Sequence, residues 1–191
     1  MKGQHEILSA VLITGILLGT VTAVYYWGMP LIQKNQDKVT LSETEKFMFL
    51  LDEKIKDIAT NGGSTRITIS VPAIVRFDGT TITAEVETTT TLYESNKWIS
   101  FFETCETSVE GIWGKHKPDV LCVFSEKLGK NKHRIHYTLG YRVLRKGNEE
   151  YLINLTGPVS SGGRGHEILI TRKGIEYKNN KINTIITISI I

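Results

Sequence analysis

The amino-acid sequence predicts an α+β protein, in which a long hydrophobic N-terminal helix is followed by an antiparallel β-rich globular head. Residues 7–27 form an uncharged apolar run that no other stretch of the 191 residues approaches. From about residue 65 onward, β-branched residues alternate with polar ones in short runs separated by turn residues, which is the pattern of strands. No window of helical periodicity interrupts these runs, which favours antiparallel sheets over an α/β arrangement.

Residues 7–27 predict a helix made for an apolar environment. At the rise of an α-helix the run is roughly 31 Å long, about the thickness of the hydrocarbon core of a bilayer. It ends in Tyr25, Tyr26 and Trp27, aromatic residues that favour the edge of a membrane. It is longer than the apolar core of a removable secretory signal, and no small-x-small cleavage site follows it. We therefore expect this helix in lipid, or inside a bundle of similar helices.

Residues 31–63 predict an amphipathic helix that continues toward the head. The Gly28-Met29-Pro30 stretch predicts a kink or a break, because proline lacks a backbone donor. Capping boxes at residues 40–43 and 42–45 indicate a helix restart, and Asn61-Gly62-Gly63 indicates its end. The apolar residues at helical spacing are Phe47, Leu50, Leu51, Ile55 and Ile58. We expect this stripe to pack against the β domain.

Residues 64–191 predict the β head. The predicted strands are 66–77 (interrupted by Pro72), 81–93, 98–105, 120–126, 134–145, 151–154, 167–172, 174–178 and 182–191. Asp78-Gly79, Lys173-Gly174 and Asn179-Asn180 are the predicted turns between neighbouring strands. Residues 182–191 are uncharged and strongly β-prone, so an exposed edge there would aggregate. We expect an intramolecular covered strand; the alternative is a strand donated to a neighbouring subunit.

The two cysteines and one sequon indicate an extracytoplasmic head. Cys105 and Cys122 are the only cysteines, and such a single pair favours one disulfide and an oxidising compartment. Two buried free thiols are the alternative. Asn154-Leu155-Thr156 is the only glycosylation sequon, which makes Asn154 a candidate glycosylation site.

The sequence contains no recognisable catalytic or cofactor motif, and we expect neither an enzyme nor a bound cofactor or metal. The glycine-rich stretch 161–166 is followed by neither a Lys-Ser/Thr pair nor a helix, so phosphate-loop templates fail. His133 and His136 fall three apart in a predicted strand, which places them on opposite faces. The formal net charge of +3 is mild and without a basic block, so nucleic acid is not an expected partner.

The N-terminus carries a family resemblance. Lys2-Gly3-Gln4, a short polar stretch with Glu6 and then the long apolar run resemble the class III signal peptide of archaeal type IV pilin-like proteins. The resemblance covers about the first sixty residues. It implies cleavage by a prepilin peptidase between Gly3 and Gln4, giving a leader of residues 1–3 and a core helix of residues 4–30. The leader is short, and Glu6 would be the third mature residue, not the fifth as in bacterial pilins.

The resemblance implies a structural subunit of an extracellular filament. The precursor would sit in the cytoplasmic membrane and assemble with copies of itself, through the pilus assembly machinery, into a helical filament whose heads face outward for adhesion or surface contact. A carboxylate at the edge of an apolar helix needs a positive partner, and the amino terminus of a neighbouring subunit would serve Glu6 in assembly. A Glu6 carboxylate solvated among head groups is the alternative.

Two other functions remain open from the sequence. One is an uncleaved, single-pass membrane-anchored protein whose external β domain binds a ligand or partner. The other is a minor pilin or pseudopilin of a secretion or uptake system.

Overall fold

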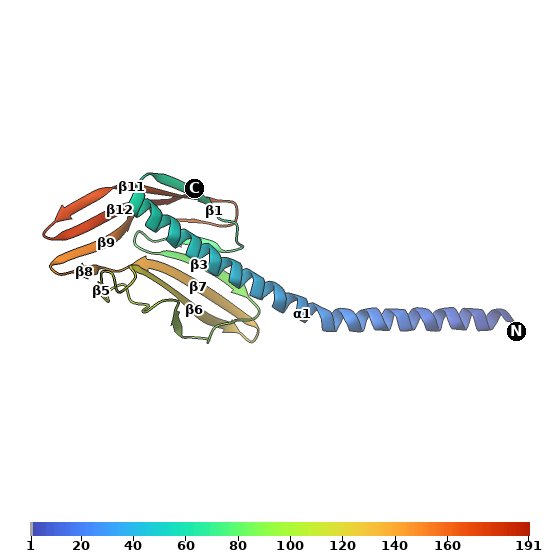
Figure 1. Cartoon of the computed structure of the whole chain (residues 1–191). Coiled ribbons are helices and arrows are strands. Elements are labelled where there is room, and N and C mark those ends of the chain that lie inside the picture. Colours follow the sequence, from blue (N-terminus) through green and yellow to red (C-terminus); the bar gives the residue numbers. More distant parts are fainter. Residues whose placement is uncertain (1) are drawn as a thin grey trace.

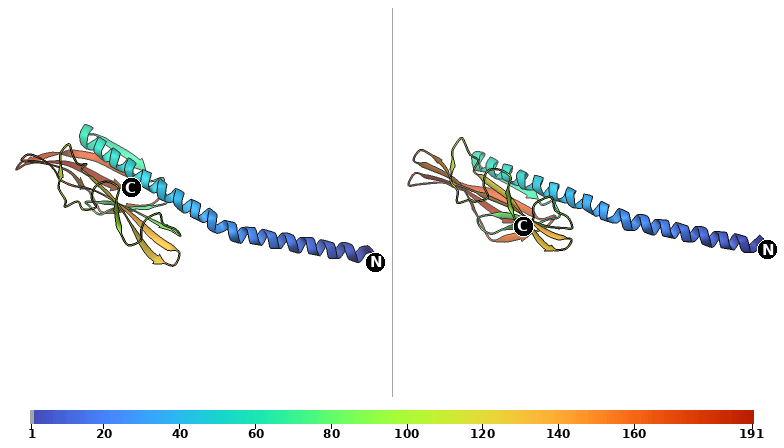
Figure 2. Two further views of the ribbon diagram at one scale, coloured as in Figure 1. Left: turned by 60° about the horizontal axis from the view of Figure 1, so that its bottom comes forward. Right: turned by 90° about the horizontal axis from the view of Figure 1, so that it is seen from below.

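The computed structural model describes residues 2–191, with side chains described from residue 9 onward, and it has the α+β architecture that the sequence predicts. A single helix, α1 (Lys2–Asn61), precedes a β head. Figure 1 shows the N-terminal half of α1 projecting far from the head, whereas its C-terminal half lies along the sheets. Both views in Figure 2 show the same separation.

Helix α1 runs through Pro30 without a break. The predicted break is therefore wrong, and so is the predicted helix restart within residues 40–45. The helix changes direction near its middle (Figure 1), which agrees with the alternative expectation of a kink. Loss of one backbone donor bends a helix without ending it where the sequence on both sides favours helix.

The C-terminal half of α1 buries one face in the head. Its fully or almost fully buried apolar residues are Leu41, Phe47, Met48, Leu51, Ile55 and Ile58. Met48, Leu51, Ile55 and Ile58 follow one another at intervals of three and four residues, and Leu41 precedes Met48 by seven, which places this set on one side of the helix. Leu50, which the sequence pattern included in this stripe, is 42% exposed and lies outside it.

The first sheet contains six strands in the order β1-β11-β12-β9-β8-β5. These are β1 (Ser64–Thr68), β5 (Gly111–Ile112), β8 (Leu144–Lys146), β9 (Glu149–Thr156), β11 (Glu167–Lys178) and β12 (Lys181–Ile190). The β9–β12 and β5–β8 pairs are parallel, and the other three pairs of this sheet are antiparallel. The predicted antiparallel arrangement therefore holds for most of the sheet but not for these two pairs. Each parallel pair is connected through intervening segments that cross to or from the second sheet, and turn signals do not reveal such crossings.

The second sheet contains six strands in the order β10-β2-β3-β7-β6-β4, and all its pairs are antiparallel. These are β2 (Ile74–Phe77), β3 (Ile82–Thr88), β4 (Trp98–Ser100), β6 (Asp119–Gly129), β7 (Lys132–Tyr141) and β10 (Ser160–Gly162). The interruption expected at Pro72 is confirmed, because β1 and β2 lie on either side of it in different sheets.

Two predicted turns of the last strands have different outcomes. Residues 167–178 form one continuous strand, with a register shift between Arg172 and Gly174, so the turn predicted at Lys173-Gly174 is wrong. A β-bulge bends a strand but keeps it in the sheet. The turn at Asn179-Asn180 is confirmed. Both asparagines have positive φ angles, 49° and 62°, as a two-residue hairpin turn requires.

Three other predicted strands are shorter than expected. The strand predicted at 81–93 ends at Thr88. The strand predicted at 98–105 ends at Ser100, and residues 101–110 form an irregular segment. The strand predicted at 134–145 is divided between β7 and β8.

The core lies where α1 crosses both sheets. The helix contacts β1, β11 and β12 of the first sheet, and β3 and β7 of the second. Strand β12 lies between β11 and β9, and its Ile186, Ile188 and Ile190 are buried. The expected intramolecular C-terminal strand is therefore confirmed, since both of its edges are already paired within the chain.

Candidate functional site

The largest exposed apolar surface is the N-terminal part of α1, which we call the apolar stem (residues 9–29). Val11, Leu18 and Val24 are 67%, 65% and 70% exposed. The stretch of α1 from Ser9 is long and apolar enough to cross a membrane. Its most apolar part is not buried against the rest of the chain. Each large apolar side chain gains about 1.5–3 kcal/mol on full burial, so this surface favours lipid or another protein over water.

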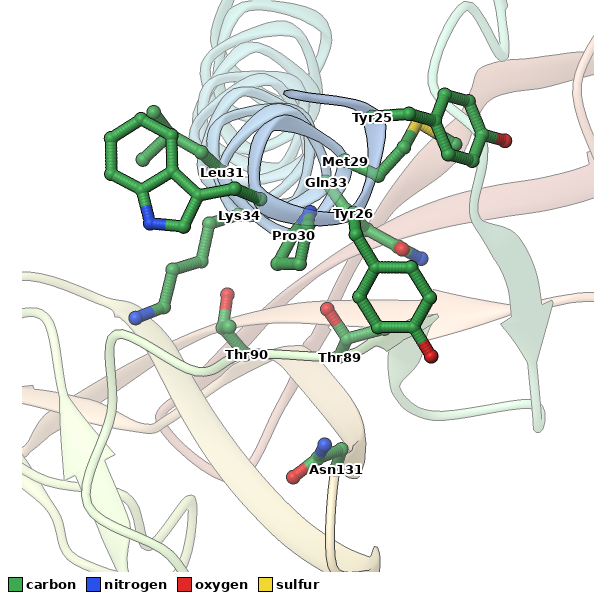
Figure 3. A pocket seen from close by; sticks show the side chains of 11 residues that line it. Tyr25, Tyr26, Met29, Pro30, Leu31, Gln33, Lys34, Thr89, Thr90 and Asn131 are labelled. Carbon is green, nitrogen blue, oxygen red and sulfur yellow. The ribbon is translucent and has the colours of Figure 1, made fainter. Parts of the chain in front are cut away.

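A groove separates the C-terminal end of the apolar stem from the edge of the head that lies nearest to the stem. Figure 3 shows Pro30 and Tyr26 on the helix side, facing Thr89 and Thr90 of the head, whereas Tyr25 points sideways from the helix. The groove encloses about 860 Å³. It lies where the aromatic belt of the sequence meets the head, so a membrane surface or a neighbouring molecule at the stem would also contact these head residues.

Asp37 fastens α1 to the head next to this groove. Its Oδ2 accepts hydrogen bonds from the backbone N–H of Thr89 (2.8 Å) and of Thr90 (3.0 Å), and from the Thr89 hydroxyl (2.5 Å). Hydrogen bonds to a charged acceptor are worth about 1.5–3 kcal/mol each. We call this arrangement the Asp37 latch.

A second polar attachment lies further along α1. Lys56 Nζ lies 2.5 Å from Asp52 Oδ2 and 3.1 Å from Asp119 Oδ1 at the start of β6. The Tyr141 hydroxyl donates to Asp52 Oδ1 at 2.9 Å. We call Asp52, Lys56, Asp119 and Tyr141 the charged cluster.

One ammonium therefore serves two buried carboxylates in this cluster. Burial raises the pKa of Asp52 above its usual value, against the opposing effect of the hydrogen bond from Lys56. Burial also disfavours the charge on Lys56, but the hydrogen bond to Asp52 and the two negative charges raise the pKa of the lysine. Asp119 Oδ2 is buried without a hydrogen-bond partner among the described residues. Perturbed pKa values often mark functional sites, but here the partners outside α1, Asp119 and Tyr141, attach the helix to the head.

The C-terminal end of α1 is attached as well. Arg172 Nη1 of β11 donates to the carbonyl oxygens of Ala59 (3.1 Å) and Thr60 (3.3 Å), which are free at the end of a helix. A Cβ atom at Gly62 would lie 2.7 Å from this guanidinium, so the helix-ending glycine also makes room for the contact. Together with the Asp37 latch and the charged cluster, Arg172 fixes α1 relative to the head along its whole C-terminal half.

The predicted disulfide is present. Cys105 and Cys122 are bonded, with their Cα atoms 5.6 Å apart. The bond ties the irregular segment after β4 to strand β6. In the same region the buried guanidinium of Arg142 donates to the Lys117 carbonyl oxygen (2.9 Å) and pairs with Glu103. This segment is thus held by one covalent and one ionic attachment.

Asn154 lies in the middle of β9. Leu155 is buried, and Ile153 packs against the core, so the alternation of a strand directs Asn154 to the opposite, outer face. The side chain is half-buried. The hydroxyl of Thr156, the third sequon residue, hydrogen-bonds to the Ile186 carbonyl oxygen at 3.3 Å. Glycosylation of Asn154 stays a prediction.

The remaining sequence-predicted residues are not brought together into a site. Gly3 and Gln4 lie in α1, and their side-chain surroundings and that of Glu6 lie outside the described residues. His133 and His136 point to opposite faces of β7, as predicted. Among the residues that the structure describes, no group of three His, Cys, Asp or Glu residues is arranged to hold a metal ion.

Sequence reasoning missed the residues that fix the helix. Asp37 and Thr89 are 52 residues apart, and Lys56 and Asp119 are 63 apart. Nothing local distinguishes them from solvated polar residues. A polar residue within the buried stripe, such as Asp52, was the one available signal, because a charge on an apolar helix face needs a partner.

Comparisons with protein-family models, curated proteins and solved structures find no match to this chain.

Proposed function

We propose that this protein is a structural subunit of an extracellular type IV pilus-like filament, with the apolar stem in the filament core and the β head outward. The observation that carries the proposal is the exposed apolar stem on a head that has its own complete core. A helix that is apolar around its whole circumference leaves lipid only for an equally apolar environment, and a bundle of identical stems supplies one.

The fixed angle between helix and head also supports assembly. The Asp37 latch, the charged cluster and Arg172 hold the C-terminal half of α1 against both sheets. Heads attached in one orientation can pack regularly around a bundle of stems, whereas freely rotating heads cannot. The disulfide fits an oxidising location for the head.

The runner-up is an uncleaved membrane anchor. The aromatic belt and the groove at the edge of the head nearest to the stem favour it, since Tyr25, Tyr26 and Trp27 suit a bilayer surface. In that case the stem stays in lipid and the head acts as a single external domain.

The deciding experiment is intact-mass and N-terminal peptide analysis of the protein from the membrane fraction and from sheared surface filaments. The filament proposal expects a mature chain beginning at Gln4 in the sheared fraction. A Gly3→Val variant, which changes the residue before the expected cut, should stay in the membrane with its first three residues still attached. A wild-type chain that retains these three residues and never leaves the membrane would remove the proposal in favour of the anchor.

A further inference from the structure

The end of the head furthest from the apolar stem carries a second unusual surface. The β11–β12 and β8–β9 hairpins extend past the C-terminal end of α1 (Figures 1 and 2). Neither the helix nor the second sheet covers the inner face of the first sheet there. We call this region the distal face.

Aromatic side chains line the distal face. Ile182 of β12 pairs with Tyr177 on one side and with Tyr151 on the other. The two tyrosines therefore point to the same face, two strand spacings or about 10 Å apart. Trp113 packs on Tyr151 with ring centroids 4.3 Å apart. Tyr177 is 74% exposed and Trp113 is 47% exposed.

This aromatic row is not needed for the core. Leu155 and Ile186, further along the same strands, already fill the space under α1. Tyrosine and tryptophan present a large apolar ring with a polar edge, and they are enriched where proteins bind partners.

A small pocket adjoins the row. It encloses about 290 Å³ between Tyr177, Ile182, Glu149 and the Asn179-Asn180 turn. That volume is just below the range of about 300–1,000 Å³ for small-molecule sites. The pocket thus combines an aromatic wall with amide and carboxylate groups.

The charges around the pocket balance. Lys181 is paired with Glu150 at 2.8 Å, and Glu149 accepts a hydrogen bond from the Tyr151 hydroxyl at 2.6 Å. Glu150 also pairs with Arg145 at 3.0 Å. Among the charged residues that line the pocket, Lys181 is compensated by Glu150, and Lys178 and Glu149 carry opposite charges. The site therefore favours an uncharged polar ligand over an anion or a cation.

We propose that the distal face binds a neutral oligosaccharide. One face of a pyranose ring carries C–H groups that pack on an aromatic ring, while its hydroxyls bond to amides and carboxylates. Tyr177 and the Trp113–Tyr151 pair lie about two strand spacings apart, which suits two sugar rings of one chain separated by a third ring over Ile182. This assignment rests on the surface role proposed above, for which it names the ligand class, and it applies to a filament and to an anchored monomer alike.

The test is a binding screen of the full-length chain against neutral oligosaccharides, including chitotetraose and cellotetraose. The protein is kept in a phosphocholine detergent, because sugar-based detergents would compete. We expect saturable binding of at least one neutral glycan and a loss of affinity of about tenfold or more in Tyr177→Ala. Tyr177 is mostly exposed, so its truncation leaves the fold intact, which circular dichroism verifies.

Two controls separate the ligand site from general surface effects. Ile74→Ala, an exposed apolar residue of the other sheet, should bind like wild type. The double variant Asn179→Gly/Asn180→Gly keeps the positive-φ turn but removes both amides, and it should weaken binding.

Three results would overturn the proposal: no binding to any neutral glycan, binding to acidic glycans alone, or binding that Tyr177→Ala does not change. Concentration-dependent self-association that Tyr177→Ala abolishes would assign the face to a second copy of the chain instead. Tyr177→Ala should still appear in sheared filaments as a chain beginning at Gln4, so failure of sugar binding is distinguishable from failure of assembly.

Discussion

At the scale of single residues, Asp78 shows how a turn acquires a dependence on pH. Its carboxylate accepts hydrogen bonds from the backbone N–H groups of Thr80 (2.8 Å) and Thr81 (2.7 Å), and from both hydroxyls. Partial burial opposes the charge, but these hydrogen bonds lower the pKa of Asp78 from 3.8 to about 2. The native protein therefore prefers the ionised carboxylate.

We predict that Asp78→Ala lowers stability at neutral pH, and that this loss shrinks as the pH falls from about 4 toward 2. A carboxyl group whose pKa is lower in the folded state stabilises that state above its unfolded pKa of 3.8. This stabilisation is lost as the pH falls through about 2, when the folded group is protonated too. Thermal unfolding of wild type and variant between pH 2 and 7 measures the difference. A gap in Tm that stays constant over this range would contradict the assignment.

Single residues also show where sequence patterns are informative. Asn179 and Asn180 specify their turn because both adopt a positive φ that few residues tolerate. Lys173-Gly174 contains a glycine, as many hairpin turns do, but it lies at a β-bulge. Glycine is also common at such register shifts within one strand. Local chemistry identifies a bend without deciding whether the chain reverses there.

At the scale of elements, the irregular segment between β4 and β6 depends on the disulfide. It contains only the two-residue strand β5, and it crosses from one sheet to the other. The Cys105–Cys122 bond and Arg142 attach it to the head, together with Phe101 and Phe102, which pack against the core. A disulfide that closes a loop of this size stabilises the folded state chiefly by restricting the unfolded chain.

We predict that the double variant Cys105→Ser/Cys122→Ser loses about 2–4 kcal/mol of unfolding free energy. Thermal unfolding followed by circular dichroism measures the loss. Reductant should lower the Tm of wild type toward that of the variant and leave the variant unchanged. Equal stability of oxidised wild type and variant would show that Arg142 and packing hold the segment without the bond.

The elements themselves were largely predictable, whereas their pairing was not. The apolar run, the stripe around Leu51 and Ile55, and most strands follow from periodicity, because burial selects side chains every 3.6 or 2 residues. Order within the sheets depends on contacts between distant segments. The antiparallel-rich head is confirmed, but the parallel β9–β12 pair within it has no local signal in the sequence.

At the scale of the whole molecule, the stem and the head form two differently solvated parts joined by one continuous helix. The apolar stem gains from lipid or from other stems, whereas the head has its own core. The angle between them depends on the buried apolar stripe of α1 and on the polar attachments along the helix. The Asp37 latch lies nearest to the stem, and it is therefore the attachment that controls the groove in Figure 3.

We predict that Asp37→Ala loosens the first turns of α1 that contact the head. It leaves the Thr89 and Thr90 N–H groups without their acceptor, which should cost about 1–3 kcal/mol of unfolding free energy. Spin labels at Gln33 and Asn131, on opposite walls of the groove, report its width. The distance distribution between them should be narrow in the labelled wild-type background and broader in Asp37→Ala.

The matched control is Asp57→Ala, which removes another helix carboxylate whose hydrogen bond, from Asn61 at 2.7 Å, stays within α1. It should leave the distance distribution narrow, because it does not touch the head.

If Asp37→Ala also leaves the distribution narrow while the protein loses stability, the remaining contacts of α1 with the head, including the charged cluster and Arg172, set the angle of the stem. Regular packing of heads would then survive loss of the latch, and sheared filaments of Asp37→Ala would form in normal amounts. A broadened distribution together with reduced filament yield would instead link the fixed angle at Asp37 to assembly.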